Sequence, residues 1–141
     1  MPYEDEPTPY ENLAEPDEEL DRLARETIGA AIEVHRHLSI GLPEAAYQNA
    51  MEIELAERGI PFERQKRVEV YYKGRLVAHG CIDLLVGKRL VVENKSCAAL
   101  IATHRLQTLT YMRLVHEPLG LLINFNVPLL KDGIKRIIAS K

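Results

Sequence analysis

The sequence predicts an α+β fold in which a mixed sheet of about four strands is flanked by helices. Apolar residues recur at helical spacing over roughly residues 17–58, and from residue 64 the pattern changes to the alternation of half-buried strands. A later helical stretch precedes one more short apolar run. Strands bracketed by helices are typical of a sheet covered by helices, and 141 residues suit one such domain.

Composition narrows the class of protein. The chain is 46% hydrophobic and 28% charged, as expected for a globular protein, and no apolar run approaches the ~20 residues of a membrane span. Its amino terminus has neither the basic start nor the apolar centre of a secretory signal. We therefore expect a cytoplasmic protein without a membrane partner. Two cysteines are too few for a four-thiolate metal site.

Acidic residues are concentrated at the amino terminus. Residues 1–19 hold eight of the 21 Asp and Glu side chains and no Lys or Arg, so the remainder carries 18 basic and 13 acidic side chains, a net charge of +5. Four prolines lie among the first acidic residues, which predicts a flexible acidic tail at residues 1–16 and a domain at residues 17–141. The mild positive balance of the domain is compatible with a polyanionic partner such as DNA.

Two helices are predicted before the first strand. Asp17 is a good N-cap, and apolar residues follow it at helical spacing as far as Leu38. A second helix is expected from Pro43, a residue preferred in the first turn, to about Arg58, with Gly59 as its stop.

Three antiparallel strands are predicted next. Alternation begins at Arg64, the pair Lys73-Gly74 marks a hairpin turn, and the returning strand leads to Asp83. The apolar residues on either side of residues 87–89 then indicate strand, turn and strand. Beyond these, we expect a helix at residues 98–116 and a buried strand at residues 120–125. The apolar residues at 134–138 fit either a strand or a helix.

Asp83, Glu93 and Lys95 are the strongest candidates for chemistry if they share one face of the sheet. Side chains alternate along a strand, so the length of the connecting loop decides this. With a three-residue loop at residues 87–89, Asp83 lies opposite Glu93, and Lys95 follows two residues on along the same face. A two-residue turn at residues 87–88 would instead separate the carboxylates, and both loop lengths are common in hairpins.

Two carboxylates and a lysine on paired strands suit a metal-assisted phosphodiester hydrolase. Mg²⁺, or Mn²⁺ in its place, prefers one or two carboxylates together with waters and substrate phosphate, so Asp83 and Glu93 are candidate ligands. The backbone carbonyl of Asn94 would complete the protein ligands, and Lys95 would hold the attacking water or the charge developing on phosphorus. The competing interpretation is a surface ion-pair ladder, which the apolar residues around Glu93 disfavour.

Polar residues on two helical stretches add further candidates. Glu44 and Tyr47 lie three residues apart at the start of the second helix, where Glu44 would assist the site or only favour the helix dipole. The later helix carries a polar stripe at i, i+3, i+4 and i+7 spacing, which is expected to line a cleft. The candidate substrate contacts are Gln107, Tyr111, Tyr47 and His104, with Thr108 as the fourth member of the stripe.

Together these residues resemble a known family. The sequence is similar to the GxxExxY protein family, which is placed within the PD-(D/E)xK nuclease superfamily, over about residues 24–137. The motifs that carry the resemblance are Gly41-x-x-Glu44-x-x-Tyr47, Asp83, Glu93-x-Lys95, Gln107-x-x-x-Tyr111, Tyr71-Tyr72-Lys73-Gly74 and the run 121–125.

The resemblance implies a PD-(D/E)xK nuclease-like core and a role for each matching residue. It implies that Glu44 is the helix carboxylate of the first motif, that Asp83 and Glu93 bind metal, and that Lys95 is the catalytic lysine. The pair formed by residues 107 and 111 resembles an additional helix motif of RecB-like nucleases.

Two positions depart from the superfamily pattern. Ile82 stands where the superfamily name has proline, and Asn94 fills a middle position that is often apolar. Because Asn94 points to the opposite face of the sheet from its neighbours, we expect it to bond a helix there. Burial without a partner would cost ~1–3 kcal/mol.

The sequence thus predicts a Mg²⁺-dependent nuclease that hydrolyses DNA phosphodiester bonds, and a homodimer would suit an enzyme that cuts both strands. A second hypothesis is a catalytically inactive nuclease-fold module that binds nucleic acid or a protein partner, which the small size and moderate basicity favour. A sugar- or peptide-directed hydrolase is less consistent with the sequence, because it leaves Lys95 and the polar stripe without roles.

Overall fold

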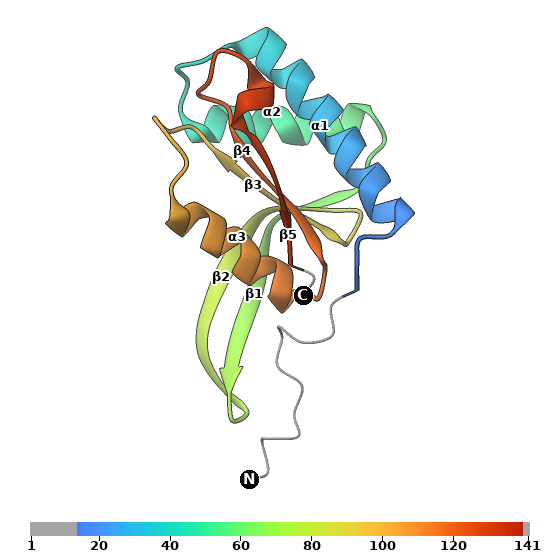
Figure 1. Cartoon of the computed structure of the whole chain (residues 1–141), viewed down its shortest axis with the longest axis vertical. Coiled ribbons are helices and arrows are strands. Elements are labelled where there is room, and N and C mark those ends of the chain that lie inside the picture. The colour runs from blue at the N-terminus through green and yellow to red at the C-terminus, as the bar shows by residue number, and fades with distance from the viewer. Residues whose placement is uncertain (1–13, 140–141) are drawn as a thin grey trace.

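The computed structural model describes residues 14–139, so nearly all of the predicted tail at residues 1–16 lies outside the described residues. The described part contains three α-helices, one short 3-10 helix and five strands (Figure 1). In chain order these are α1 (Glu18–Leu38), α2 (Glu44–Glu57), β1 (Phe62–Tyr72), β2 (Arg75–Val86), β3 (Leu90–Lys95), α3 (Ala102–Leu114), β4 (Leu119–Asn124), η1 (Leu130–Gly133) and β5 (Ile134–Ile138).

The five strands form one mixed sheet in the order β1-β2-β3-β4-β5. Strands β1 to β3 form the predicted antiparallel series, β3 and β4 are parallel, and β5 returns antiparallel to β4. Helix α3 connects the parallel pair, because parallel neighbours need a long crossover. The predicted α+β class is confirmed, and the carboxyl-terminal segment, which the sequence left open, is a strand.

Helices cover both faces of the sheet and create two cores. On one face α1 and α2 pack against alternate residues of the central strands, such as Leu84 and Val92. On the other face α3 packs through Met112 against Val91 and Leu122. Strand β3 is thus buried on both sides, which explains its almost uninterrupted apolar sequence before Glu93.

The helix boundaries follow local hydrogen bonds. Asp17 caps α1 as predicted, since its carboxylate accepts the backbone N–H of Leu20 at 2.9 Å. Helix α3 begins at Ala102, four residues after the predicted start at residue 98. The reason lies in Asn124, whose side chain accepts the N–H of Cys97 at 3.1 Å and donates to its carbonyl at 3.0 Å, which holds that residue beside β4.

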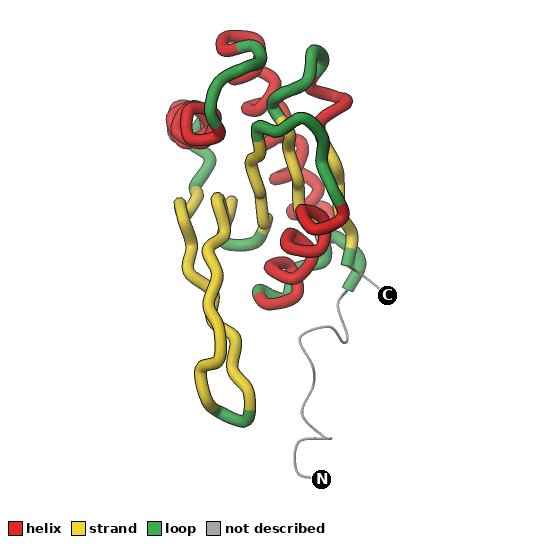
Figure 2. The backbone as a smooth tube through the Cα atoms, turned by 90° about the vertical axis from the view of Figure 1, so that its left-hand side faces the viewer, coloured by secondary structure: helices red, strands yellow, loops and turns green. Residues whose placement is uncertain are grey.

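The β1–β2 hairpin extends beyond the rest of the domain (Figures 1 and 2). Its tip is the predicted turn at Lys73 and Gly74, which have φ angles of 49° and 77° and connect Tyr72 to its cross-strand partner Arg75. Positive φ at both central residues is the geometry of a type I′ turn, whose twist matches that of the strands. The register also shifts between Val70 and Tyr71, which marks a β-bulge.

None of the helices in the described residues combines the length and the apolar character that crossing a membrane requires.

Candidate functional site

The loop between β2 and β3 has the length that unites the candidate residues. Residues 87–89 form a three-residue loop in which Val86 lies opposite Leu90, and Gly87 and Lys88 both adopt positive φ, at 60° and 65°. Strand pairing continues to Leu84 opposite Val92. The predicted register is therefore confirmed, and the two candidate carboxylates come next on the two facing strands.

The backbone ladder opens at these carboxylates. The N–H of Asp83 donates to Oε2 of Glu93 at 2.8 Å, and the N–H of Asn94 donates to Oδ2 of Asp83 at 2.8 Å. Beyond the last ladder pair, Leu84 and Val92, each acid thus accepts a backbone N–H of the opposite strand through a side-chain oxygen. Both backbone donors remain satisfied, and both acids are held between the two strands.

This position disfavours negative charge on both acids. Burial raises the pKa of Glu93, which is 2% exposed, and the charge of Asp83 adds to this effect, giving a value of about 8. Burial also raises the pKa of Asp83, and the charge of Glu44 acts in the same direction. The N–H of Asn94 and the ammonium group of Lys95 oppose that change. A cation beside two such acids would favour the charged form of both carboxyl groups, so their position suits a cation site.

Lys95 lies on the α3 side of the sheet, next to the predicted polar stripe. Its Nζ lies 3.5 Å from Oε1 of Gln107, whose Nε2 donates to the hydroxyl of Tyr111 at 3.4 Å. The same hydroxyl accepts the backbone N–H of Cys81 at 3.4 Å. These long hydrogen bonds link the lysine on β3 to α3 and to β2.

A hollow of about 250 Å³ opens beside Asp83. Glu44, the first residue of α2, is exposed at its margin, and its negative charge raises the pKa of both Asp83 and Glu93. The other lining residues are Ala45, Gln48, Asn49, Arg64 and Gln65. Acidic and basic groups thus converge at the open edge of the site.

Gln48 supports the candidate site through hydrogen bonds, and the sequence analysis did not identify it. It is 7% exposed, and its Nε2 donates to the carbonyl of Asp83 at 3.0 Å and to Oε2 of Glu52 at 3.0 Å. Its Oε1 accepts from Nδ2 of Asn94 at 2.7 Å, which confirms the expected bond between Asn94 and a helix. Gln48 therefore connects both acid-bearing strands to α2. A polar residue on a face otherwise formed by Tyr47, Met51 and Leu55 was the available signal.

Arg64 was also missed. It lines the hollow and lies 2.9 Å from Glu52 through its Nε. Arg64 thus places a positively charged side chain at this margin of the hollow.

Two predicted substrate contacts lie elsewhere. Tyr47 is fully buried and stacks on Phe125 with ring centroids 4.8 Å apart, and its hydroxyl donates to the carbonyl of Ser39 at 2.6 Å. A direct substrate contact by Tyr47 is therefore wrong, and the residue instead fixes the loop before Glu44. His104 accepts the N–H of Ile101 through Nδ1 at 3.1 Å, so it caps α3.

The residues present fit a divalent cation of the magnesium type. Among residues 14–139, no three Asp, Glu, His or Cys side chains gather as a metal site. The described hydrogen bonds of the acid pair engage Oδ2 of Asp83 and Oε2 of Glu93, which leaves Oδ1 and Oε1 for a cation. Two carboxylates suffice for Mg²⁺, which keeps several of its waters, whereas zinc prefers a nitrogen or sulfur set.

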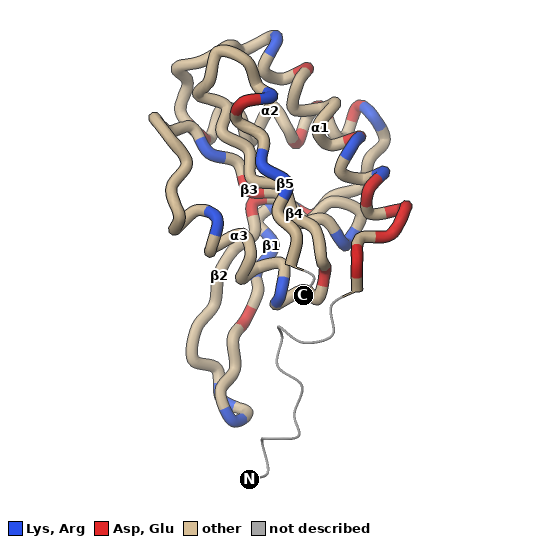
Figure 3. Tube along the Cα trace, viewed as in Figure 1, with Lys and Arg blue, Asp and Glu red and all other residues tan. Residues whose placement is uncertain are grey.

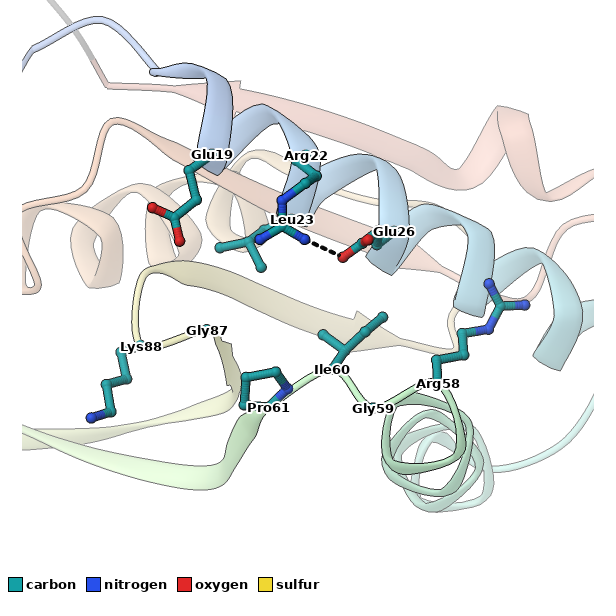
Figure 4. A pocket seen from close by; sticks show the side chains of 10 residues that line it. All are labelled: Glu19, Arg22, Leu23, Glu26, Arg58, Gly59, Ile60, Pro61, Gly87 and Lys88. Atoms are coloured by element: carbon teal, nitrogen blue, oxygen red, sulfur yellow. Dashed lines mark hydrogen bonds and ion pairs between the residues drawn. The ribbon is translucent and has the colours of Figure 1, made fainter.

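A larger hollow of about 390 Å³ lies at the other end of the β2–β3 hairpin, between α1 and the loop after α2 (Figure 4). The ion pair of Arg22 and Glu26 spans part of its wall at 2.8 Å, and Gly87 and Lys88 line its floor. None of the predicted site residues lines it, so it is not the candidate site.

Comparison with known proteins adds one finding. A family model described as the PD-(D/E)XK nuclease superfamily matches residues 21–137. The comparison with curated proteins found no match, and neither did the comparison with solved structures.

Proposed function

Because the chain belongs to the PD-(D/E)XK nuclease superfamily, we propose that it is a Mg²⁺- or Mn²⁺-dependent nuclease that hydrolyses phosphodiester bonds of DNA. Nucleases of this superfamily typically use divalent metals. The observation that carries the proposal is the pair of facing carboxylates at the opening of the β2–β3 ladder, Glu93 buried and Asp83 half-buried, with Lys95 two residues beyond Glu93 on β3.

Each residue of the site has a distinct task in this proposal. Asp83 and Glu93 hold the cation, with the backbone carbonyl of Asn94, and Glu44 adds negative charge at the open edge. A bound cation would supply positive charge at the phosphate and would lower the pKa of water. Lys95, oriented by Gln107, holds the attacking water and stabilises the charge developing on phosphorus.

Further parts of the proposal rest on the sequence. The motifs around Glu44, Asp83 and Gln107 support membership of the GxxExxY family within the superfamily. A cytoplasmic enzyme is consistent with the sequence, and a homodimer would place two sites on the two strands of a duplex. Gln107 and Tyr111 lie where they can contact the phosphate chain of a substrate.

Cleavage of DNA by site variants tests the proposal. We expect purified protein to cut DNA with Mg²⁺ or Mn²⁺ and to stop when a chelator is added. Asp83→Asn and Lys95→Gln should each lower the cleavage rate by about 10³-fold, because they remove a metal ligand and a charge on the developing phosphate oxygens. Circular dichroism of both variants checks that the fold is intact.

Lys135→Gln serves as the matched control, since Lys135 is an exposed cation on β5 at the opposite edge of the sheet from β1. Its activity should equal that of the wild type. Equal activity of Asp83→Asn and the wild type would show that a contaminating nuclease cuts the DNA. Salt-sensitive DNA binding without cleavage under any metal would instead favour the inactive nuclease-fold module.

A further inference from the structure

The β1–β2 hairpin projects from the sheet as a two-stranded arm, defined here as residues 67–80 (Figures 1 and 2). Strands β1 and β2 pair with each other throughout the arm, and β3 pairs only with residues 84–86 of β2. Residues 71–79 are all exposed. An isolated two-stranded ribbon is marginally stable, so this arm depends on its anchorage in the sheet.

The tip of the arm exposes large apolar side chains. Tyr71, Tyr72, Leu76 and Val77 are between 48% and 61% exposed, and they make up four of the twelve large apolar side chains that the described residues expose. The Nζ of Lys73 lies 5.2 Å from the ring centroid of Tyr72. Clustered exposure of this kind marks a surface for interaction, whereas single exposed residues do not.

The arm is also basic. Residues 67–80 contain Arg67, Lys73 and Arg75 and a single carboxylate, Glu69, which pairs with Arg67 at 3.6 Å. With three cations and one carboxylate, residues 67–80 carry a net charge of +2, and two of the cations lie at the tip, where Figure 3 shows the end of the hairpin in blue. Such a surface complements the phosphates of nucleic acid.

The outer edge of β1 is protected against pairing with another strand. Strand β1 is the edge of the sheet, and five of its residues are charged, namely Glu63, Arg64, Lys66, Arg67 and Glu69. The β-bulge near Tyr71 adds a second obstacle. The charged side chains and the bulge both disfavour the addition of a strand from a second copy, so we do not expect the arm to extend the sheet between two molecules.

The base of the arm lies at the candidate active site. A Cβ on Gly80 would lie 2.7 Å from Cε1 of Tyr111, so α3 rests directly on the arm at this glycine. The next N–H, of Cys81, donates to the Tyr111 hydroxyl, which is linked through Gln107 to Lys95. The tip at residue 74 is nine residues from Asp83 on the same strand, which is about 30 Å, or about nine base pairs.

We propose that residues 67–80 form a DNA-binding arm that enters the major groove of a duplex held at the Asp83–Glu93 site. The major groove admits a two-stranded β-ribbon. Lys73 and Arg75 contact the phosphates that border the groove, and Tyr71 and Tyr72 make apolar contacts with sugars and thymine methyl groups. The proposal rests on the proposed function, because the active site supplies the point at which the duplex is held.

Removing the two cations at the tip tests the arm without altering the active site. The variant is Lys73→Asn with Arg75→Gln, in which the new Asn-Gly pair favours the type I′ turn and keeps the hairpin intact. Binding of a 24-base-pair duplex is followed by fluorescence anisotropy in EDTA over a series of salt concentrations. We expect a rise in Kd of at least about tenfold at low salt, and a salt slope reduced by about 1.8 because two phosphate contacts are lost.

Two further variants separate the contributions. Lys131→Gln with Lys135→Gln removes two exposed cations from the other end of the sheet and should leave Kd within about twofold of the wild type. Tyr71→Ser with Tyr72→Ser should weaken binding while the salt slope stays unchanged, since no charge is removed.

Each outcome bears on one proposal. Equal Kd and salt slope for the tip variant and the wild type would overturn the DNA-binding arm even if the protein cuts DNA. A wild-type protein that does not bind the duplex would overturn it too. Light scattering that shows a dimer dissociated by the tip variant, with DNA affinity unchanged, would assign the arm to self-association. Tip-dependent binding without cleavage in Mg²⁺ or Mn²⁺ would uphold the arm and count against the nuclease.

Discussion

Glu93 is buried beside a second acid, Asp83, and both features disfavour a negative charge on its carboxyl group. It is 2% exposed and accepts a backbone N–H from Asp83, yet burial and the neighbouring acid raise its pKa from 4.5 to about 8. A carboxyl group of this kind holds its proton near neutral pH until a cation replaces it. In the proposed function, metal binding at this residue would therefore release a proton.

The linkage predicts how stability depends on pH without metal. Between about pH 4.5 and pH 8 the folded protein keeps a proton on Glu93 that the unfolded chain has released. The free energy of unfolding should therefore fall as pH rises through this window, by up to about 1.4 kcal/mol per pH unit. Urea denaturation of wild type and Glu93→Gln in EDTA measures it, because the variant lacks the titrating group.

The difference between the two proteins reports the titration of Glu93 together with its effect on the neighbouring Asp83. A wild type and a Glu93→Gln variant with parallel pH profiles would contradict the assigned pKa. Mn²⁺ should also raise the melting temperature of the wild type more at pH 8 than at pH 6, because fewer protons compete for the site.

The sequence predicted which acids form the candidate site, but not which residues hold the strands that carry them. Strand alternation is a local rule, and it reduced the placement of Asp83, Glu93 and Lys95 to the length of one loop, which the sequence left open and the structure shows to be three residues. Gln48 bonds across the molecule to β2 and β3, and no local rule identifies such a partner. Helical spacing brought Tyr47 near the site but could not tell a buried ring from an exposed one.

At the scale of elements, the packing of α3 on the sheet depends on a second glycine besides Gly80. A Cβ on Gly120 in β4 would lie 2.6 Å from Sδ of Met112 in α3 and 3.3 Å from the carbonyl oxygen of Val91. The absent side chain thus lets the helix approach the sheet closely. Because α3 also carries Gln107, this contact sets the distance between the helix and Lys95.

Gly120→Ala is expected to destabilise the fold by about 1–3 kcal/mol through overpacking, as measured by urea denaturation. In the Met112→Ala background the same substitution should cost less, since the main clash is removed. Equal costs in both backgrounds would show that the helix does not rest on this glycine.

Elements with strong local signals were predictable, and those that depend on partners were not. The N-cap at Asp17 and the Lys73-Gly74 turn are encoded within a few residues, and both were predicted correctly. The start of α3 depends on Asn124, far along the chain. The apolar pattern of residues 134–138 suits either a strand or a helix, and pairing with the edge of β4 makes the segment a strand.

At the scale of the whole molecule, Arg89 joins three distant segments. Its guanidinium group forms two parallel hydrogen bonds with Glu117, with Nε to Oε1 at 2.9 Å and Nη2 to Oε2 at 3.0 Å, and it contacts Asp17 at 2.9 Å. The hydrogen bonds that Arg89 donates to both acids raise its pKa. The cluster fastens the start of α1 and the segment before β4 to the β2–β3 loop.

Arg89→Met should lower the free energy of unfolding by about 1–3 kcal/mol, because Glu117 is left without its partner in a half-buried position. The matched control is Arg25→Met, whose exposed pair with Glu18 at 3.4 Å is worth less than about 0.5 kcal/mol. Urea denaturation of both variants provides the comparison. Equal effects would place the Arg89 cluster among ordinary surface ion pairs.

The opening of the β2–β3 ladder has a consequence for how such a chain can evolve. A sheet centre favours neutral side chains and continuous backbone pairing, and here two acids interrupt both, which is local frustration in the sense of energy landscapes. Under the proposed nuclease function, heat tolerance and hydrolysis therefore select for different residues at positions 83 and 93. A lineage freed from the need to cut phosphodiesters would drift toward a closed, uncharged sheet at this point and retain the fold as a scaffold.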